Sequence, residues 1–529
     1  MKLTIQIYTW LTALVFLGFG CSDFLKEYSM DQVYAASCED LNEVLIGNAY
    51  MKSSTQWQFS VSSPSESIYY PWLFVMDDDV DELIVTTDAA IKFNSTITFL
   101  RNFYTWQAEP FFAINANRNE IKDATFEKLY QHIGYVNVII DYVDEFPEDP
   151  IEDRMRIRGE GQFLRGAYYL MLNNLYGLAY DANNAKTDLG VPLNLTEYVE
   201  EKYFSRASVQ EVYNVIVRDL KGACENLKGV KQKNFYRANE LATNILLSRV
   251  YLYMGDYANV IAQCDSALRQ GCPLLDLNTF RVSDNMKARD FILDEANPEI
   301  VFTMGSSIAT TLFARKTGVG DCNYCVSNTL AELYNLSDEI EDLRWECYYT
   351  GHATAMGSFV PLKIGADKTL KVFEAFVIRT IEAYLNKAEA QAMMGDIAGA
   401  IATLQPVLNT RYAAGKQPQL ASLGEENLVT FIRDERRREL CFEGHRWQDL
   451  KRYAVAPKYP VKSEIRHTIY SPRDRTGGNY AGYFILKPYG EDGGWILPYP
   501  KEEIIYNNGS LENTPRPERE NADESYRTE

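Results

Sequence analysis

Histidine is scarce in this chain, with four copies in 529 residues: His132, His352, His445 and His467. None of them belongs to a His-Glu-x-x-His pair, and the chain has no Gly-x-Ser-x-Gly elbow and no glycine-rich phosphate loop. The 73 acidic residues are too many for spacing alone to select a glycosidase pair. We therefore expect no catalytic residues and predict that the chain is not an enzyme.

Positive charge is also in short supply. The chain has 53 Lys and Arg against 73 Asp and Glu, which gives a net charge of −20 and a pI near 4.9. A surface of this sign repels phosphate backbones and anionic headgroups, so nucleic acid is a poor candidate ligand. Neutral sugars and cationic peptides remain as ligand classes.

Long apolar runs are absent after the first 20 residues. The stretch Ile5–Gly20 carries no charged side chain and follows Lys2, which is typical of a signal peptide over residues 1–20 and too short for a comfortable membrane span. Cys21 follows directly, as in a lipoprotein cleavage site, so we expect lipidation of Cys21 and membrane contact only through this anchor. The alternative is an ordinary signal peptide cleaved nearby, with Cys21 incidental.

The other eight cysteines are spread thinly, unlike a disulfide framework, and we expect buried thiols. Cys322-x-x-Cys325, with Cys347 and His352 downstream, has a spacing that a zinc site or a local disulfide would also fit. These alternatives stay open, and we predict no metal and no cofactor.

Three aspartates alternate as in a calcium loop: Asp77, Asp79 and Asp81, with Asp88 at the twelfth place. The sixth place holds Glu82 where the sharp turn needs Gly, which argues against an EF-hand. The run of residues 77–79 could still hold calcium weakly or hydrogen-bond sugar hydroxyls.

Helical periodicity dominates three segments, Gly159–Gly177, Asn239–Gly255 and Phe376–Gly395, each of which ends on glycine. The turn at residues 254–256 (Met-Gly-Asp) recurs at residues 394–396, as expected for tetratricopeptide-like helix pairs that stack on one another. Residues 271–371 and 455–495 indicate loops and short strands, and the polar tail after residue 507 is expected to fray. The fold class is therefore mostly α.

Several segments resemble the SusD/RagB family, in the right order along the chain: Cys21–Leu25, Gly159–Tyr169, Arg237–Tyr257, Glu435–Arg452 and Leu497–Pro500. The strongest match is Glu435–Arg452. Alternating Glu and Arg on a helix usually marks a solvated, salt-bridged face. Here we interpret the segment as architecture that does not touch ligand, with Phe442, Trp447 and Leu450 pointing inward.

The resemblance implies a SusD-like fold with four tetratricopeptide-like helix pairs and an irregular C-terminal half. We expect a signal peptide (1–20), an N-terminal region with helix pairs (21–270) and a C-terminal RagB/SusD region with a loop-rich insertion (271–529). It also implies a surface-exposed lipoprotein on a Bacteroidetes outer membrane, a TonB-dependent SusC-like transporter as partner, and no catalysis. Oligosaccharides are the usual ligand, and some relatives take peptides.

Sugar recognition requires aromatic faces together with polar side chains that bind hydroxyls. Tyr69, Tyr70 and Trp72 precede Asp78 in a proline-containing loop, and Tyr324 lies in the central insertion; these five are the predicted ligand-binding residues. The alternative is that Trp72 and its neighbours close the core. The competing functions are peptide capture, a surface glycoside hydrolase and a helical-repeat scaffold.

Overall fold

The computed structural model describes residues 35–53, 69–70, 72–83, 95–114, 117, 120–280, 291–313, 324–334, 337, 339–351, 358–363, 371–471 and 479–527. Its α-helices are α3 (Cys38–Val44), α4 (Leu73–Met76), α5 (Ser95–Tyr104), α6 (Ala124–Tyr142), α7 (Ile151–Tyr176), α8 (Val209–Asn226), α9 (Glu240–Met254), α10 (Tyr257–Arg269), α11 (Ala309–Leu312), α12 (Asn328–Glu332), α13 (Arg344–Tyr348), α14 (Ile381–Met393), α15 (Ile397–Arg411), α16 (Glu425–Leu440), α17 (Arg446–Ala454) and α18 (Lys501–Tyr506). The predicted signal peptide and Cys21 lie outside the described residues.

The strands pair two by two, all antiparallel. They are β1 (Val80–Glu82) with β3 (Tyr324–Val326), β2 (Ile300–Met304) with β6 (Phe376–Arg379), β4 (Tyr349–Gly351) with β5 (Phe359–Pro361), and β7 (Ile465–Ser471) with β8 (Asn479–Leu486). Short strands lie among loops here, which confirms the prediction of loops and short strands for residues 271–371. The β7–β8 hairpin adds regular structure to a segment that was expected to be irregular.

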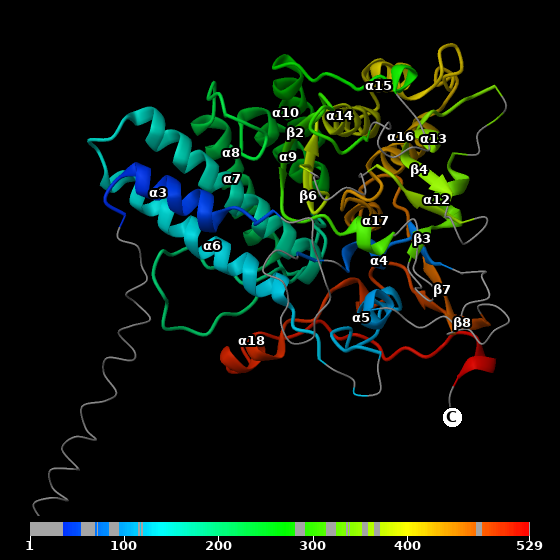
Figure 1. The fold of residues 1–529 in the computed structure, drawn as a ribbon, viewed down its shortest axis with the longest axis horizontal. Coiled ribbons are helices and arrows are strands. Elements are labelled where there is room, and N and C mark those ends of the chain that lie inside the picture. The colour runs from blue at the N-terminus through cyan, green and yellow to red at the C-terminus, as the bar shows by residue number, and fades with distance from the viewer. Residues whose placement is uncertain are drawn as a thin grey trace, which may run out of the picture.

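The helices stack in sequence, and the mostly α fold class is confirmed. Helix α6 packs on α7, α7 on α8, α8 on α9 and α9 on α10. Helix α10 then packs on α14, which contacts α15 and α16 (Figure 1). The two similar helix pairs, α9–α10 and α14–α15, are therefore neighbours in space although about a hundred residues separate them in the chain. In the described part of the chain no helix is both long and apolar enough to cross a membrane.

The repeated Met-Gly-Asp turn has the predicted structure. Gly255 and Gly395 adopt φ values of 72° and 85°, which L side chains rarely adopt and glycine tolerates. Asp256 and Asp396 then cap the next helix, accepting from the backbone N–H groups of Asn259 and Gly399. Each turn thus ends one helix and starts its partner.

Two boundaries differ from the prediction. The expected helix Phe376–Gly395 begins only at Ile381, because Phe376–Arg379 pairs with β2 as a strand. Helix α7 begins at Ile151, eight residues before the predicted start at Gly159. The glycine at 159 lies inside the helix, where a Cβ would come within 2.8 Å of Leu227, so it permits the close approach of α8 and does not mark an end.

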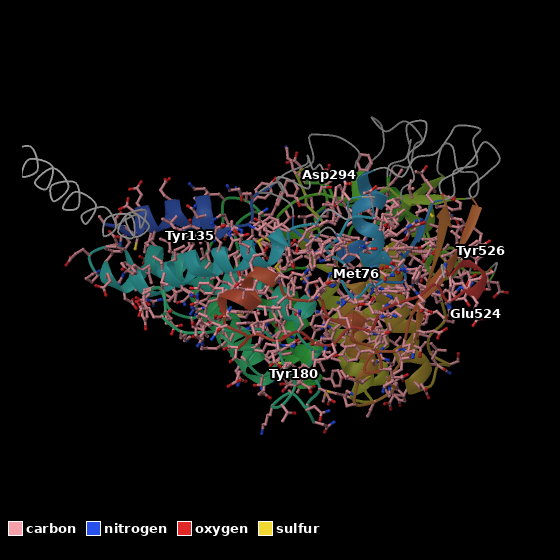
Figure 2. The ribbon with its side chains drawn as sticks, turned by 90° about the horizontal axis from the view of Figure 1, so that it is seen from below. Met76, Tyr135, Tyr180, Asp294, Glu524 and Tyr526 are labelled. Atoms are coloured by element: carbon pink, nitrogen blue, oxygen red, sulfur yellow. The ribbon has the colours of Figure 1, made fainter. Side chains whose placement is uncertain are left out.

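The tail does not fray as predicted over its described part. Leu511 is buried, and Arg516 donates to the backbone oxygens of Gln107, Gly494 and Ile496. Tyr526 packs edge-on against Tyr480 of β8, and Figure 2 shows Glu524 and Tyr526 beside the last two strands. The polar composition reflects side chains that bind backbone carbonyls of other segments.

The Glu/Arg segment on α16 is buried, so the solvated-face alternative is wrong and the architectural reading fits. Glu439 accepts from Arg379 at 2.9 Å, from Arg411 at 2.8 Å and from Tyr348 at 3.0 Å. Glu435 is paired with Arg344 at 2.8 Å. Trp447, Phe442 and Leu450 are buried as expected. One apolar core joins both predicted regions, and the division at residue 270 stays a prediction.

Candidate ligand-binding site

Four of the five sequence-predicted residues are buried aromatics. The Tyr69 hydroxyl lies 2.8 Å from His132 Nε2, and the Tyr70 hydroxyl donates to the backbone oxygen of Ala375. Trp72 is 4% exposed and stacks on Phe103 with ring centroids 4.9 Å apart. Tyr324 is fully buried, 5.2 Å from the ring of Tyr104. None of these rings presents an open face, which fits the core-closing alternative, and their contact with ligand stays a prediction.

Asp78 joins two distant parts of the chain. Its carboxylate accepts from Arg446 Nε at 2.6 Å and Nη2 at 2.8 Å and lies 3.2 Å from Arg437. Burial alone would raise the pKa of Asp78, but the guanidiniums of Arg437 and Arg446 hold it well below its usual range. The neighbouring Asp79 also pairs with Arg437, at 2.7 Å. Asp78 is therefore ionised and pairs with one arginine from α16 and one from α17.

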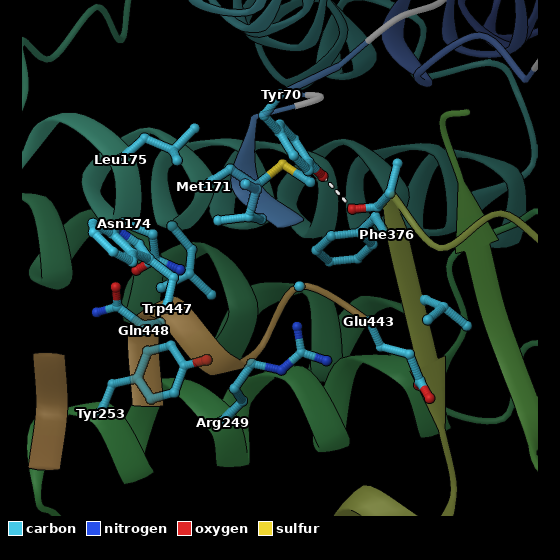
Figure 3. Close-up of a pocket in the computed structure, with 15 residues that line it drawn as sticks. Tyr70, Met171, Asn174, Leu175, Arg249, Tyr253, Phe376, Glu443, Trp447 and Gln448 are labelled. Atoms are coloured by element: carbon cyan, nitrogen blue, oxygen red, sulfur yellow. Dashed lines mark hydrogen bonds between the residues drawn. The ribbon is translucent and has the colours of Figure 1, made fainter. Parts of the chain in front are cut away.

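Tyr70 borders a small cavity between α7, α9, β6 and α17. Figure 3 shows Tyr70, Met171, Arg249, Phe376 and Trp447 around it. The cavity holds about 50 Å³, against roughly 300 Å³ or more for an ordinary small-molecule site. It can hold water and cannot admit a sugar ring.

The cysteines of the possible zinc site are only partly described. Cys325 is a buried free thiol whose pKa burial raises well above the usual range, and Cys347 is also buried. Cys322 and His352 lie outside the described residues. Within those residues no group of three or more His, Cys, Asp and Glu is arranged to hold a metal ion.

A larger hollow opens where the segment after α5 meets the segment before α18. Its volume is about 310 Å³, within the range of small-ligand sites. We call it the aromatic pocket; it is lined by Ala108, Glu109, Pro110, Phe111, Phe112, Glu120, Ile121, Lys122, Asp123, Pro498, Tyr499, Pro500, Lys501, Glu502 and Asn513.

Two half-buried phenylalanines form one wall of the aromatic pocket. Phe111 meets Trp72 edge-on at 5.4 Å and Phe103 at 5.1 Å, so the predicted Trp72 lies directly behind this wall. Phe112 is held by an antiparallel bridge to Glu120 and by the side chain of Asn102, which donates to its carbonyl at 2.6 Å. The ammonium of Lys501 lies 4.8 Å from the Phe112 ring, a cation–π distance.

The opposite wall is the segment 498–500, Pro-Tyr-Pro. The Tyr499 ring stacks on Tyr176 at 5.7 Å, and its hydroxyl donates to the backbone oxygen of Gly190 at 3.1 Å. The Asn513 amide oxygen accepts from the Tyr499 N–H at 2.7 Å, which leaves the amide nitrogen of this exposed residue available as a donor. Prolines on both sides fix the backbone that carries the ring.

Polar groups of both signs surround these rings. Glu109, Glu120, Lys122, Lys501 and Glu502 are exposed at the rim. Asp123 is buried below, where it caps α6 and accepts from Tyr176; burial raises its pKa to about 7. Aromatic faces beside carboxylates and amides are what a sugar needs for its C–H face and its hydroxyls.

Sequence reasoning missed most of this pocket. Residues 109–112 (Glu-Pro-Phe-Phe) and 498–502 lie nearly 400 positions apart, and no local pattern indicates that they meet. The available signal was the pair of adjacent phenylalanines after a proline, outside any helical stripe. In the sequence alone, residues 497–500 (Leu-Pro-Tyr-Pro) indicate only the family resemblance.

Comparisons with known proteins match most of the chain. The model of the SusD family matches residues 362–516, and a second model, described as "Starch-binding associating with outer membrane", matches residues 75–252. SusD-like protein P38 of Formosa agariphila is 24% identical over 411 residues, which cover 66% of this chain and 76% of that protein.

Solved structures share the fold. A SusD superfamily protein from Bacteroides thetaiotaomicron has a TM-score of 0.65 at 19% identity, covering 91% of this chain and all of that one. A SusD-like carbohydrate-binding protein from Bacteroides vulgatus has a TM-score of 0.65 at 19% identity, covering 89% and 97%. At these identities the likeness establishes the fold alone.

Proposed function

The chain belongs to the SusD/RagB family, and we propose that it captures oligosaccharides at the cell surface. One of the two matching family models is described as starch-binding and associating with the outer membrane. In this proposal the protein is a lipoprotein anchored through Cys21. It passes the sugar unaltered to a TonB-dependent SusC-like transporter in the outer membrane.

The aromatic pocket is the observation that carries the proposal. It combines the half-buried rings of Phe111 and Phe112 with rim carboxylates and the Asn513 amide, in a volume suited to one or two sugar units. Trp72 supports it from behind through Phe111. Among the five residues predicted from the sequence, Trp72 therefore has the most direct connection to binding.

Binding is tested by titrating a panel of neutral oligosaccharides, with peptides alongside, into wild type and Phe112→Ala. Loss of one stacking ring is expected to weaken sugar binding by roughly tenfold, about 1.4 kcal/mol. Phe204→Ala is the matched control, because Phe204 is also half-buried beneath a lysine ammonium, at 4.7 Å, and does not line the pocket. Equal affinities for Phe112→Ala and Phe204→Ala would remove the pocket from the proposal.

Peptide capture is the second candidate, favoured by the three glutamates among the five exposed charged residues at the rim. Glu109, Glu120 and Glu502 would attract Lys or Arg side chains. Binding of basic peptides in preference to every sugar of the panel, with loss in Glu120→Gln, would support it. Release of new reducing ends from a sugar would instead point to a hydrolase.

The anchor and the partner need separate experiments. Radiolabelled palmitate should enter the wild type and not Cys21→Ser, and surface protease should remove the protein from intact cells. Affinity purification of the full chain from its own membrane should bring a TonB-dependent transporter with it. Recovery of the chain alone under mild detergent would count against the partner.

A further inference from the structure

A second large hollow lies between the start of α7, helix α3 and the loop before α9. Its volume is about 700 Å³. We call it the basic pocket; it is lined by Asn42, Ile46, Tyr50, Met51, Lys52, Ser53, Asp153, Arg156, Lys231, Gln232, Lys233, Asn234, Tyr236, Arg237, Thr303 and Met304. Helix α3 lies across α6 and α7 at the side of the molecule shown in Figure 1.

The sign of the charge is reversed here. Five basic residues and one acidic residue line the pocket, on a chain whose net charge is −20. Because acidic residues outnumber basic ones in the chain, a cluster of basic residues is not expected to arise by chance. The electrostatic potential inside the pocket favours an anion, although the potential of the whole chain does not. The overall charge of the sequence gives no sign of this reversal.

Two of the basic residues are held in fixed positions at the pocket floor. Arg237 pairs with the fully buried Glu160 through Nε at 2.5 Å and Nη2 at 2.8 Å, and Arg156 reaches the same carboxylate at 3.0 Å. The amide oxygen of Asn42 accepts from both guanidiniums, at 2.9 and 3.1 Å. Glu160 therefore orients both arginines, and Arg156 also pairs with Asp153 at 3.4 Å, so the excess positive charge of the pocket comes from its lysines.

Glu160 is itself fixed, which keeps this floor rigid. The Tyr50 hydroxyl donates to Glu160 Oε2 at 2.5 Å, and it accepts from the backbone N–H of Ala238 at 2.9 Å. Arginine positioned in this way is pre-organised for carboxylate or sulfate oxygens, because its donors lie in one plane and lose little entropy on binding.

The rim adds charge and neutral partners. Lys231 and Lys233 are exposed on the loop that follows α8, and Lys52 lies on the facing segment. Gln232, Asn234 and the half-buried Tyr236 ring stand among them. Amides and one ring face beside cations suit a sugar that carries acidic groups. A concave site also fits a sugar unit better than the flat surface of a membrane.

We propose that the basic pocket binds the carboxylate or sulfate groups of an acidic oligosaccharide. This inference rests on the proposed function and adds the ligand class to it: a glycan with anionic substituents, recognised at a second place on the same protein. The neutral part of such a chain remains available to the aromatic pocket.

The test compares an oligosaccharide rich in sulfate esters or uronates with its desulfated or carboxyl-reduced counterpart. Wild type should bind the acidic form more tightly, and Lys231→Gln/Lys233→Gln should weaken that binding roughly tenfold at low salt, with a smaller change at 0.5 M salt. The matched control is Lys186→Gln/Lys487→Gln, which removes two exposed lysines that do not line this pocket.

The outcomes separate this inference from the proposed function. Equal affinity for the acidic and neutralised sugars, or acidic-sugar binding unchanged in Lys231→Gln/Lys233→Gln, overturns the inference and leaves neutral-sugar binding at the aromatic pocket intact. If Lys231→Gln/Lys233→Gln loses binding to vesicles with 30% anionic lipid and keeps its affinity for the acidic sugars, the inference is also overturned. The basic residues are then assigned to contact with the membrane. If Phe112→Ala weakens neutral-sugar binding roughly tenfold while Lys231→Gln/Lys233→Gln affects only acidic sugars, both claims stand.

Discussion

Replacing Glu439 with Gln tests the buried ion network on which the C-terminal half is assembled. Glu439 is fully buried and accepts from Arg379 and Arg411, with the Tyr348 hydroxyl at 3.0 Å and Arg344 Nη1 at 3.5 Å. The variant keeps the size of the side chain and removes its charge. Three buried guanidiniums then share one fewer carboxylate.

The cost follows from the uncompensated charge. Removing one partner of a buried pair destabilises by about 3–5 kcal/mol. With an unfolding entropy of roughly 2.1 cal/mol/K per residue, a chain of about 500 residues has an entropy near 1 kcal/mol/K, so Tm should fall by about 3–5 °C. Glu426→Gln is the matched control in the same helix, because Glu426 is exposed, and it should shift Tm by less than about 0.5 °C.

The pH dependence supplies a second, independent readout by differential scanning calorimetry. Burial raises the pKa of these carboxyls, but the arginines overcome this and lower the pKa of Glu435 to about 2 and that of Glu439 well below its usual range. The folded chain therefore stays ionised where the unfolded chain binds protons. This contribution is complete above about pH 5 and is lost as the pH falls toward 2. Equal Tm values for Glu439→Gln and Glu426→Gln, or a gap between them that persists at low pH, would show that the charge of Glu439 does not stabilise the fold.

Three further predictions concern single residues. His132 is buried between Tyr69 and the carbonyl of Asn48, and desolvation lowers its pKa to about 4. As the pH falls from about 6.5 to 4, the free energy of unfolding of wild type should therefore drop by up to roughly 3 kcal/mol relative to that of His132→Gln. Parallel pH profiles of Tm for the two proteins would contradict this. Gly493→Ala would place a Cβ 1.8 Å from the Pro515 oxygen and should loosen the C-terminal tail, which would be measured as faster proteolysis there. In the control Gly134→Ala the new Cβ meets open space, so this variant should be neutral or slightly stabilising. Equal proteolysis rates for the two variants would count against the packing of the tail on Gly493. Trp72→Ala should cost about 3–5 kcal/mol in stability because of its stacked contacts, and an unchanged Tm would show that the ring is not part of the core.

Local rules account for much of the fold. Helix periodicity with glycine and aspartate at the ends was enough to find α7, α9 and α14 and the repeated turn between helix pairs. These signals lie within a few residues of one another. The apolar pattern of Phe376–Arg379 runs straight into α14 and predicts a helix, and only pairing with β2, some 75 residues earlier, makes this segment a strand.

The features that could not be predicted from the sequence depend on contacts between distant residues. The Glu/Arg pattern of α16 has the periodicity of a solvated face, and it is buried because Arg344, Arg379 and Arg411 arrive from other elements to neutralise it. The basic pocket likewise combines residues near 50, 156 and 235. In both cases the role of a charged residue depends on a distant partner, and the sequence does not identify that partner.

The proposed function requires that the chain bind oligosaccharide without altering it. Isothermal titration of the purified protein with the oligosaccharide panel, followed by analysis of the recovered sugar, tests this most directly. We predict saturable binding of at least one sugar, recovered intact, with affinity about tenfold lower in Phe112→Ala and unchanged in Phe204→Ala. Absence of binding across the panel, or recovery of shortened sugars, would rule out the proposed function.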